Sequence, residues 1–264
     1  MQSLPLMKRA LLLAASLLAA ASVAHAQTSS GTLDSVRDCE LRYRVHGPAT
    51  TPRGPAVVIA HGFMRTGEFM TGWAEALERA GMTAVTVDMC ASNAPGGRHA
   101  DNGADLVAVR RALGFASVVY VGVSAGGLAA LIAASLDPDA TRGLLLLDPT
   151  NAGGHARRAA SRIDAPVAAL VAKPQICNAW RNLDPALETL RDATILRVDG
   201  ASHCDFEWPT DAFCRVACVS MGGSARHRRA QERIRDVGLS FIEAIGDDAP
   251  DALSRWKGGI GEMP

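Results

Sequence analysis

The feature that most constrains the fold is a regular alternation of two kinds of segment, which begins at Pro55. Short runs of β-branched and aliphatic residues are separated by longer Ala-rich stretches with helical spacing. The runs predicted as strands are 56–62, 83–89, 117–123, 143–149, 166–172 and 194–200. Each is almost continuously apolar, which is typical of strands covered on both faces. The alternation therefore predicts an α/β fold, with a mostly parallel twisted sheet and helices on both faces.

The segments around these strands complete the expected domain. Amphipathic or Ala-rich stretches predict helices over 71–81, 102–114, 125–136 and 225–246. Residues 35–47 alternate apolar with polar side chains, which predicts an edge strand or hairpin. No insertion is long enough for a large lid domain, so we expect a single domain over 27–246. Residues 247–264 have little periodicity and are predicted to be a loosely ordered tail.

The first 26 residues predict export. Lys8 and Arg9 precede an apolar run, and Ala24-His25-Ala26 follows it with the small-x-small pattern of a signal-peptidase site. We expect a Sec-type signal peptide over 1–26, cleavage after Ala26, a secreted or periplasmic protein and no remaining membrane span. Lysine plus arginine equal aspartate plus glutamate at 27 each, so the net charge predicts no nucleic-acid partner.

Six cysteines follow this segment, an even number that predicts up to three disulfides in an oxidising compartment. Cys177 follows the fifth predicted strand and Cys204 follows the sixth, so a bridge between them would join neighbouring loops. The expected pairs are Cys39–Cys90, Cys177–Cys204 and Cys214–Cys218. Cys204 paired with Cys214 or Cys218 is the main alternative. The spacing does not match a zinc site, and no metal is expected.

A candidate nucleophile lies in the sequence Gly122-Val123-Ser124-Ala125-Gly126. This pattern follows a predicted strand and opens a predicted helix. A serine at the tip of such a sharp turn is exposed to substrate, and the flanking glycines let strand and helix approach closely. The alternative is a tight packing turn without chemistry.

At this motif the chain resembles the α/β-hydrolase superfamily. His61-Gly62-Phe63 also resembles that family's histidine-glycine signature. The resemblance implies that the backbone N–H groups of Phe63 and Ala125 form an oxyanion hole. It also implies a structural role for His61, whose alternative role is the general base.

His203 is the expected general base, because it follows the last predicted strand, where the order nucleophile, acid, histidine places it. Asp148 is the expected acid. The run 166–180 contains no acidic residue, whereas Asp148 ends the strand before it. Asp199 and Asp205 are alternatives for the acid, and a simple turn before Pro149 is the alternative role for Asp148.

The position of Asp148 and the Asp148-Pro149 dipeptide resemble the chlorophyllase-like and dienelactone-hydrolase-like branch of secreted esterases. Chlorophyllases carry Ser-Arg at the turn where this chain has Ser124-Ala125. Pigment hydrolysis is therefore not implied.

Large apolar side chains near these motifs are candidates for the substrate pocket. They are Met64, Trp180, Phe206 and Trp208. Together the motifs predict a secreted serine hydrolase that cleaves small or polymeric carboxylic esters through an acyl-enzyme, without metal or organic cofactor. A peptidase or amidase with the same three residues is one alternative, and a non-catalytic binding module on this fold is the other.

Overall fold

The computed structural model describes residues 27–48, 50–90, 98–218, 223–247 and 249–259. The predicted signal peptide, residues 1–26, lies outside the described residues. Among the residues that are described, no helix is both long enough and apolar enough to cross a membrane.

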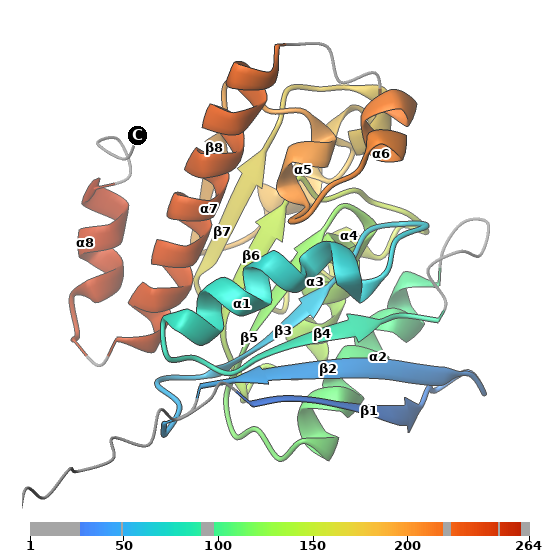
Figure 1. Ribbon diagram of the computed structural model, residues 1–264, viewed down its shortest axis with the longest axis vertical. Helices are drawn as coiled ribbons and strands as arrows, with labels where there is room; N and C mark the ends of the chain where they lie inside the picture. Colours follow the sequence, from blue (N-terminus) through green and yellow to red (C-terminus); the bar gives the residue numbers. More distant parts are fainter. Residues whose placement is uncertain (1–26, 49, 91–97, 219–222, 248, 260–264) are drawn as a thin grey trace, which may run out of the picture.

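The centre of the molecule is an eight-stranded sheet with the order β1-β2-β4-β3-β5-β6-β7-β8 (Figure 1). Its strands are β1 Gln27–Asp34, β2 Glu40–Gly47, β3 Ala56–Ala60, β4 Ala84–Asp88, β5 Val118–Val123, β6 Thr141–Leu147, β7 Val167–Val171 and β8 Ala193–Arg197. The pairings β1–β2 and β2–β4 are antiparallel, and all other pairings are parallel. The predicted α/β fold with a mostly parallel sheet is confirmed. The segment 35–47, predicted as an edge strand or hairpin, contains β2, but the edge of the sheet is β1, which precedes that segment and was not predicted.

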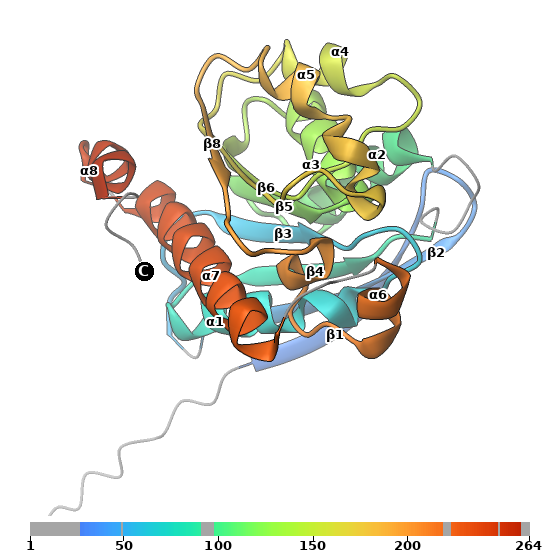
Figure 2. The ribbon, with the colours of Figure 1, turned by 90° about the horizontal axis from the view of Figure 1, so that it is seen from above.

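Helices cover both faces of this sheet, as the apolar strands require (Figure 2). The helices are α1 Thr71–Arg79, α2 His99–Ala112, α3 Ala125–Leu136, α4 Ala156–Ala160, α5 Asp184–Leu187, α6 Ala212–Ala217, α7 Ser224–Gly246 and α8 Ala252–Gly259. One buried cluster joins a sheet face to α2, α3, α4 and α5, and the other joins the opposite face to α1 and α7. The strands β3, β5, β6 and β7 have no exposed residue except Arg142 in β6, because both faces are covered.

The C-terminal segment differs from the expectation of a loosely ordered tail. Helix α8 occupies Ala252–Gly259, and Trp256 is buried with its ring centroid 5.0 Å from that of Phe241 in α7. The sequence 252–259 is too short to show a clear helical periodicity, but Trp256 supplies enough apolar surface to attach this helix to α7.

The topology brings distant parts of the chain to one edge of the sheet. The parallel strands β3, β5, β6 and β8 all end there, and the loops that follow them carry Gly62, Ser124, Asp148 and His203. In open α/β sheets this carboxyl edge is where ligands bind.

Candidate active site

Ser124 occupies a sharp turn between β5 and α3. Its backbone has φ 55° and ψ −123°, in a region that L-residues rarely adopt. The turn is held by hydrogen bonds from Ser124 N to Leu147 O (3.0 Å) and from Gly127 N and Thr150 N to Ser124 O. A strained residue that is fixed on both sides in this way is typical of a functional position.

The two flanking glycines are required by close backbone approach. A Cβ atom on Gly122 would overlap the carbonyl oxygen of Gly126, and one on Gly126 would overlap the carbonyl oxygens of His61 and Ala60. No side chain can move to relieve these overlaps, because the opposing atoms belong to the backbone. The Gly-x-Ser-x-Gly spacing is therefore explained by the packing of α3 against β5 and β3.

Asp148 follows β6 and is 1 % exposed. Its Oδ2 lies 2.6 Å from Nδ1 of His203, and its Oδ1 accepts a hydrogen bond from Ala172 N (2.9 Å). The Asn178 side-chain amide donates to the same carboxylate, 3.2 Å from Oδ2. The buried carboxylate thus has three donors, which fix its orientation toward the imidazole.

The imidazole of His203 lies in the short helix η3, His203–Phe206, after β8. It is 8 % exposed and faces the same cavity as Ser124. With Nδ1 engaged by Asp148, Nε2 is the nitrogen left for another partner. Three distant segments of the chain therefore bring a hydroxyl, an imidazole and a carboxylate to one edge of the sheet.

A cavity of about 220 Å³ contains this hydroxyl and imidazole. It is lined mainly by the loop after β3, by α6 and by two disulfide-bonded segments. The lining residues besides Ser124 and His203 are Gly62, Phe63, Met64, Arg65, Cys177, Glu207, Phe213, Cys214, Ala217 and Cys218. The expected pocket residue Met64 is among them, and so is Phe63, whose N–H is expected in the oxyanion hole.

The loop after β3 is held beside Ser124 by His61. Its Nε2 accepts a hydrogen bond from Met89 N (3.0 Å), and its Nδ1 lies 2.8 Å from Gly62 O. Burial lowers the pKa of His61, so the ring is neutral and matches these two partners. Both nitrogens are thus engaged with backbone, which agrees with the structural role and leaves no nitrogen for proton transfer.

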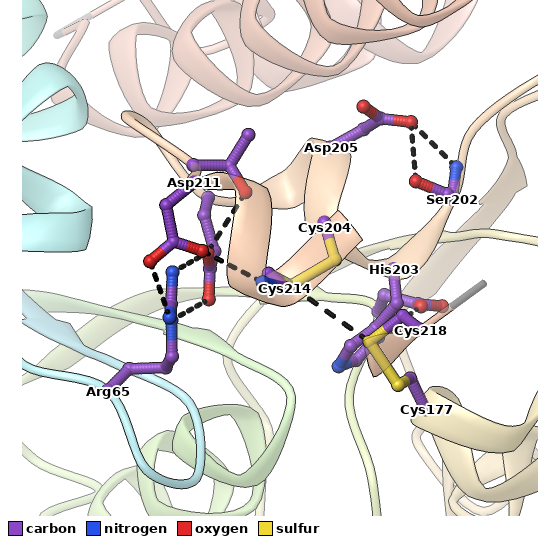
Figure 3. Close-up of a disulfide and its surroundings, with 12 residues drawn as sticks. Arg65, Cys177, Ser202, His203, Cys204, Asp205, Asp211, Cys214 and Cys218 are labelled. Atoms are coloured by element: carbon purple, nitrogen blue, oxygen red, sulfur yellow. Dashed lines mark hydrogen bonds and ion pairs between the residues drawn. A yellow bond between two sulfur atoms is a disulfide. The ribbon is translucent and has the colours of Figure 1, made fainter. Parts of the chain in front are cut away.

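Arg65 connects this loop to the histidine segment (Figure 3). Its guanidinium forms a two-pronged pair with the Glu207 carboxylate, with N–O distances of 2.8 and 2.7 Å, and a further bond of 3.1 Å to Asp211. It also stacks on the Phe69 ring, 3.4 Å from the centroid. The hydrogen bonds and charges of Glu207 and Asp211 keep the pKa of Arg65 above its usual value despite burial, so this group stays cationic.

The alternative acids have other partners or positions. Asp205 accepts hydrogen bonds from Ser202 N (2.7 Å) and from Gln231 Nε2, and its Oδ2 lies 2.8 Å from Nδ1 of His227 in α7. It attaches the histidine segment to α7. Asp199 is exposed on the loop after β8.

The structure corrects two of the three expected disulfides. Cys39 and Cys90 are paired as expected, whereas Cys177 pairs with Cys218 and Cys204 with Cys214. The expected pairs Cys177–Cys204 and Cys214–Cys218 are therefore wrong. The reason is that Cys214 in α6 and Cys218 directly after α6 face different neighbours. Cys214 lies against η3 and Cys218 against the segment after β7, with Cα–Cα distances of 5.9 and 5.4 Å.

Three of the expected pocket residues lie outside the Ser124 cavity. Phe206 is fully buried in the core, and its carbonyl accepts a hydrogen bond from Trp73 Nε1. Trp208 packs edge-on against Trp73 and under the guanidinium of Arg235. Trp180 is 70 % exposed and lines a neighbouring depression. The Phe206 and Trp208 predictions fail because these large rings are needed between η3, α1 and α7.

Several residues of the site were missed. Asn178 lies in the loop after β7, a loop without an acidic residue. Its side-chain amide donates a hydrogen bond to the Asp148 carboxylate. The contacts of Arg65 with Glu207 and of Phe213 with the cavity were also missed. Only Asn178 has a signal in the sequence, because it immediately follows Cys177 in the loop after the strand that lacks an acidic residue.

Among the described residues, one group brings three potential metal-ligand atoms close together, but it does not form a metal site. Cys204, Cys214 and Cys218 are the group that comes close enough, and all three are in disulfides. Their sulfurs are thus not available as thiolate ligands.

Comparison with known proteins bears on the fold. Residues 55–175 match the family model described as the alpha/beta hydrolase fold. A predicted CIB-like hydrolase from Thermoplasma acidophilum superposes with a TM-score of 0.57 at 15% identity, over 74% of this chain and 98% of that one. A PEG-bound, cold-adapted esterase from an Arctic intertidal metagenomic library superposes with a TM-score of 0.53 at 16% identity, over 65% of this chain and 84% of that one. No curated protein sequence matches the chain.

At these sequence identities the similarity to the solved structures shows the fold alone. The sheet order, the strained turn at Ser124 and the family match over 55–175 lead to the same conclusion. The protein has the α/β-hydrolase fold.

Proposed function

We propose that this protein is a serine hydrolase that cleaves carboxylic esters. The observation that carries the proposal is the 2.6 Å contact between Asp148 and His203, beside a cavity that also contains the strained Ser124. A packing turn or a binding module would need no such pair. The esterase among the similar folds supports the ester as the bond attacked, and the three disulfides support an oxidising compartment, in line with the proposed signal peptide.

The proposed reaction begins with proton transfer from Ser124 Oγ to Nε2 of His203. Asp148 keeps the Nδ1 proton of the imidazole pointing toward itself and stabilises the imidazolium that forms. Ser124 attacks the ester carbonyl, and the backbone N–H groups of Phe63 and Ala125 stabilise the oxyanion. The alcohol leaves with the proton from His203. Water then repeats these steps on the acyl-enzyme and releases the acid.

Hydrolysis of 4-nitrophenyl acetate by the mature chain tests this proposal. We expect Ser124→Ala to lower kcat by about a thousand-fold or more, because loss of a nucleophile removes the covalent route. Ser135→Ala is the matched control, since Ser135 lies on the same helix α3 and its hydroxyl bonds only to Ile132 O within the helix. Circular dichroism checks that both variants fold. Turnover by Ser124→Ala equal to that of the control would refute the mechanism.

The acid is tested separately by Asp148→Asn. The amide keeps the size of the side chain but no longer stabilises the imidazolium, so kcat should fall by about ten-thousand-fold near neutral pH. Asp205→Asn is the control, because Asp205 belongs to the same segment as His203 but bonds to Ser202, Gln231 and His227. A kcat of Asp148→Asn equal to that of the wild type would exclude Asp148 from the proposed relay.

A further inference from the structure

The cavity beside Ser124 is too small to enclose a long substrate. Its volume is about 220 Å³, whereas pockets that enclose a drug-sized ligand measure roughly 300–1,000 Å³. The carbonyl and a short substituent fill such a space. Any longer chain on either side of the ester must therefore lie outside it, against the neighbouring surface.

That surface contains a second depression of about 270 Å³. Its lining residues are Lys173, Pro174, Gln175, Ile176, Trp180, Gly200, Ala201, Ser202, Cys218 and Arg226. Cys218 lines both hollows, and its disulfide partner Cys177 lines the cavity of Ser124. Figure 3 shows this disulfide beside His203. The two hollows are therefore neighbours, with Cys218 as a common border.

The indole of Trp180 is held toward solvent in this depression. It is 70 % exposed, although exposure of so large an apolar group is unfavourable. The backbone of Ala179, Trp180 and Arg181 has φ of 47°, 56° and 60°, a run of left-handed residues without glycine. Such a conformation is costly and persists only where the surroundings enforce it.

Three restraints enforce it here. Cys177 is bonded to Cys218, the fully buried Asn178 donates to Asp148 Oδ2, and Trp180 N donates to Gln175 O at 2.9 Å. The same short segment therefore orients the carboxylate beside His203 and presents an exposed aromatic ring. A rigid ring in this setting is suited to bind a ligand, because little conformational entropy is lost on contact.

Exposed apolar side chains are concentrated around these two hollows. Of the nine large hydrophobic residues that are exposed in the described part of the chain, six lie on the three segments that border them. These six are Phe63, Met64, Ile176, Trp180, Phe213 and Val216. An apolar surface that adjoins the cavity of the candidate nucleophile is suited to bind an apolar part of the substrate.

We propose that the depression lined by Ile176 and Trp180 is a distal subsite, which binds the apolar chain of a long ester beyond the bond attacked at Ser124. This inference rests on the proposed esterase function and adds a substrate class to it. The enzyme accordingly prefers long-chain esters over acetate esters.

The ratio of kcat/KM for 4-nitrophenyl decanoate to kcat/KM for 4-nitrophenyl acetate tests the subsite, with both substrates below their solubility limits. We expect Trp180→Ala to lower this ratio about tenfold, because an aromatic contact is lost only by the long substrate. Trp180→Phe keeps most of the ratio, since a ring remains. Leu136→Ala, at an exposed apolar position at the end of α3, leaves the ratio unchanged. An unchanged ratio in Trp180→Ala would overturn the proposal.

A binding measurement separates this proposal from the catalytic one. In the Ser124→Ala variant, methyl decanoate should shift tryptophan emission to the blue, because Trp180 is the exposed tryptophan, whereas Trp73 and Trp256 are buried and Trp208 is half-buried. The shift should be lost in Ser124→Ala combined with Trp180→Phe. Absence of the shift in the first variant would refute the subsite, whatever its catalytic activity. A shift together with unimpaired ester hydrolysis by Ser124→Ala would instead refute the proposed mechanism alone.

Discussion

The two halves of the candidate site are held in place by different means. The Ser124 turn is fixed by backbone packing between β5, α3 and β3, where glycines are required by overlap with carbonyl oxygens. The His203 segment has little regular structure, and a disulfide, a buried ion pair and the Asp205–His227 contact hold it. Positioning by the sheet depends on single backbone atoms, whereas positioning by cross-links is spread over several side chains. Substitutions should therefore be more damaging at the turn than at any one cross-link.

The largest effect is expected for Gly126→Ala. The new Cβ would overlap the carbonyl oxygens of His61 and Ala60, so the β5–α3 turn cannot close and the protein should lose several kcal/mol of stability or fail to fold. Urea unfolding and the soluble yield measure the loss. Gly258→Ala is the control, because Gly258 is exposed in α8 with open space around it, and alanine there should stabilise by up to about 1 kcal/mol. Similar stability of the two variants would contradict the packing argument.

The buried ion pair should have the next largest effect. Glu207→Gln leaves the guanidinium of Arg65, whose side chain is 8 % exposed, without its two-pronged partner. Loss of one member of a buried pair costs about 3–5 kcal/mol, and Asp211 should offset part of this cost. Asp211→Asn is the comparison, since that residue is more exposed and should cost about 1 kcal/mol or less. A larger loss in Asp211→Asn, measured by urea unfolding, would reverse the assignment.

Removal of the Cys204–Cys214 disulfide should have a moderate effect on stability and a clear effect on turnover. Its sequence separation of 10 corresponds to about 3 kcal/mol in the chain-entropy description. The variant with both cysteines replaced by alanine should therefore unfold at a lower urea concentration. Its kcat should also be lower than that of the wild type, because Cys204 adjoins His203. The Cys39–Cys90 pair is the matched control. With a separation of 51 its loss costs about 4 kcal/mol, but kcat should change far less.

The smallest effect concerns pH. Burial lowers the pKa of His46, His61 and His99 in the folded protein. The unfolded chain then binds more protons than the folded protein below about pH 6.5. Their contribution is present above that pH and is lost as pH falls through the folded pKa values, with a slope of up to about 1.4 kcal/mol per pH unit for each ring. His61→Asn should make the dependence between pH 7 and pH 5 shallower. An unchanged slope would exclude His61 as a source.

The comparison also explains what the sequence could predict. The strands β3 to β8 and the Ser124 turn depend on local patterns of apolar residues and glycine, and these strands were predicted with small shifts at their ends, whereas β1 was not predicted. The disulfide pairs depend on which way α6 faces after folding, and spacing cannot give this. The prediction that Phe206 and Trp208 line the substrate pocket is wrong for the same reason, because the direction of a side chain depends on the folded packing. Phe206 and Trp208 lie near His203 in sequence, but their rings fill the core around Trp73.

The central claim is that Ser124 is a nucleophile made reactive by His203. The most direct test is to react the protein with a fluorophosphonate and locate the adduct by peptide mass spectrometry. We expect one adduct, on Ser124, that forms rapidly in the wild type and at least a hundred-fold more slowly in His203→Ala. An adduct elsewhere, or labelling of Ser124 at the same rate without His203, would contradict it.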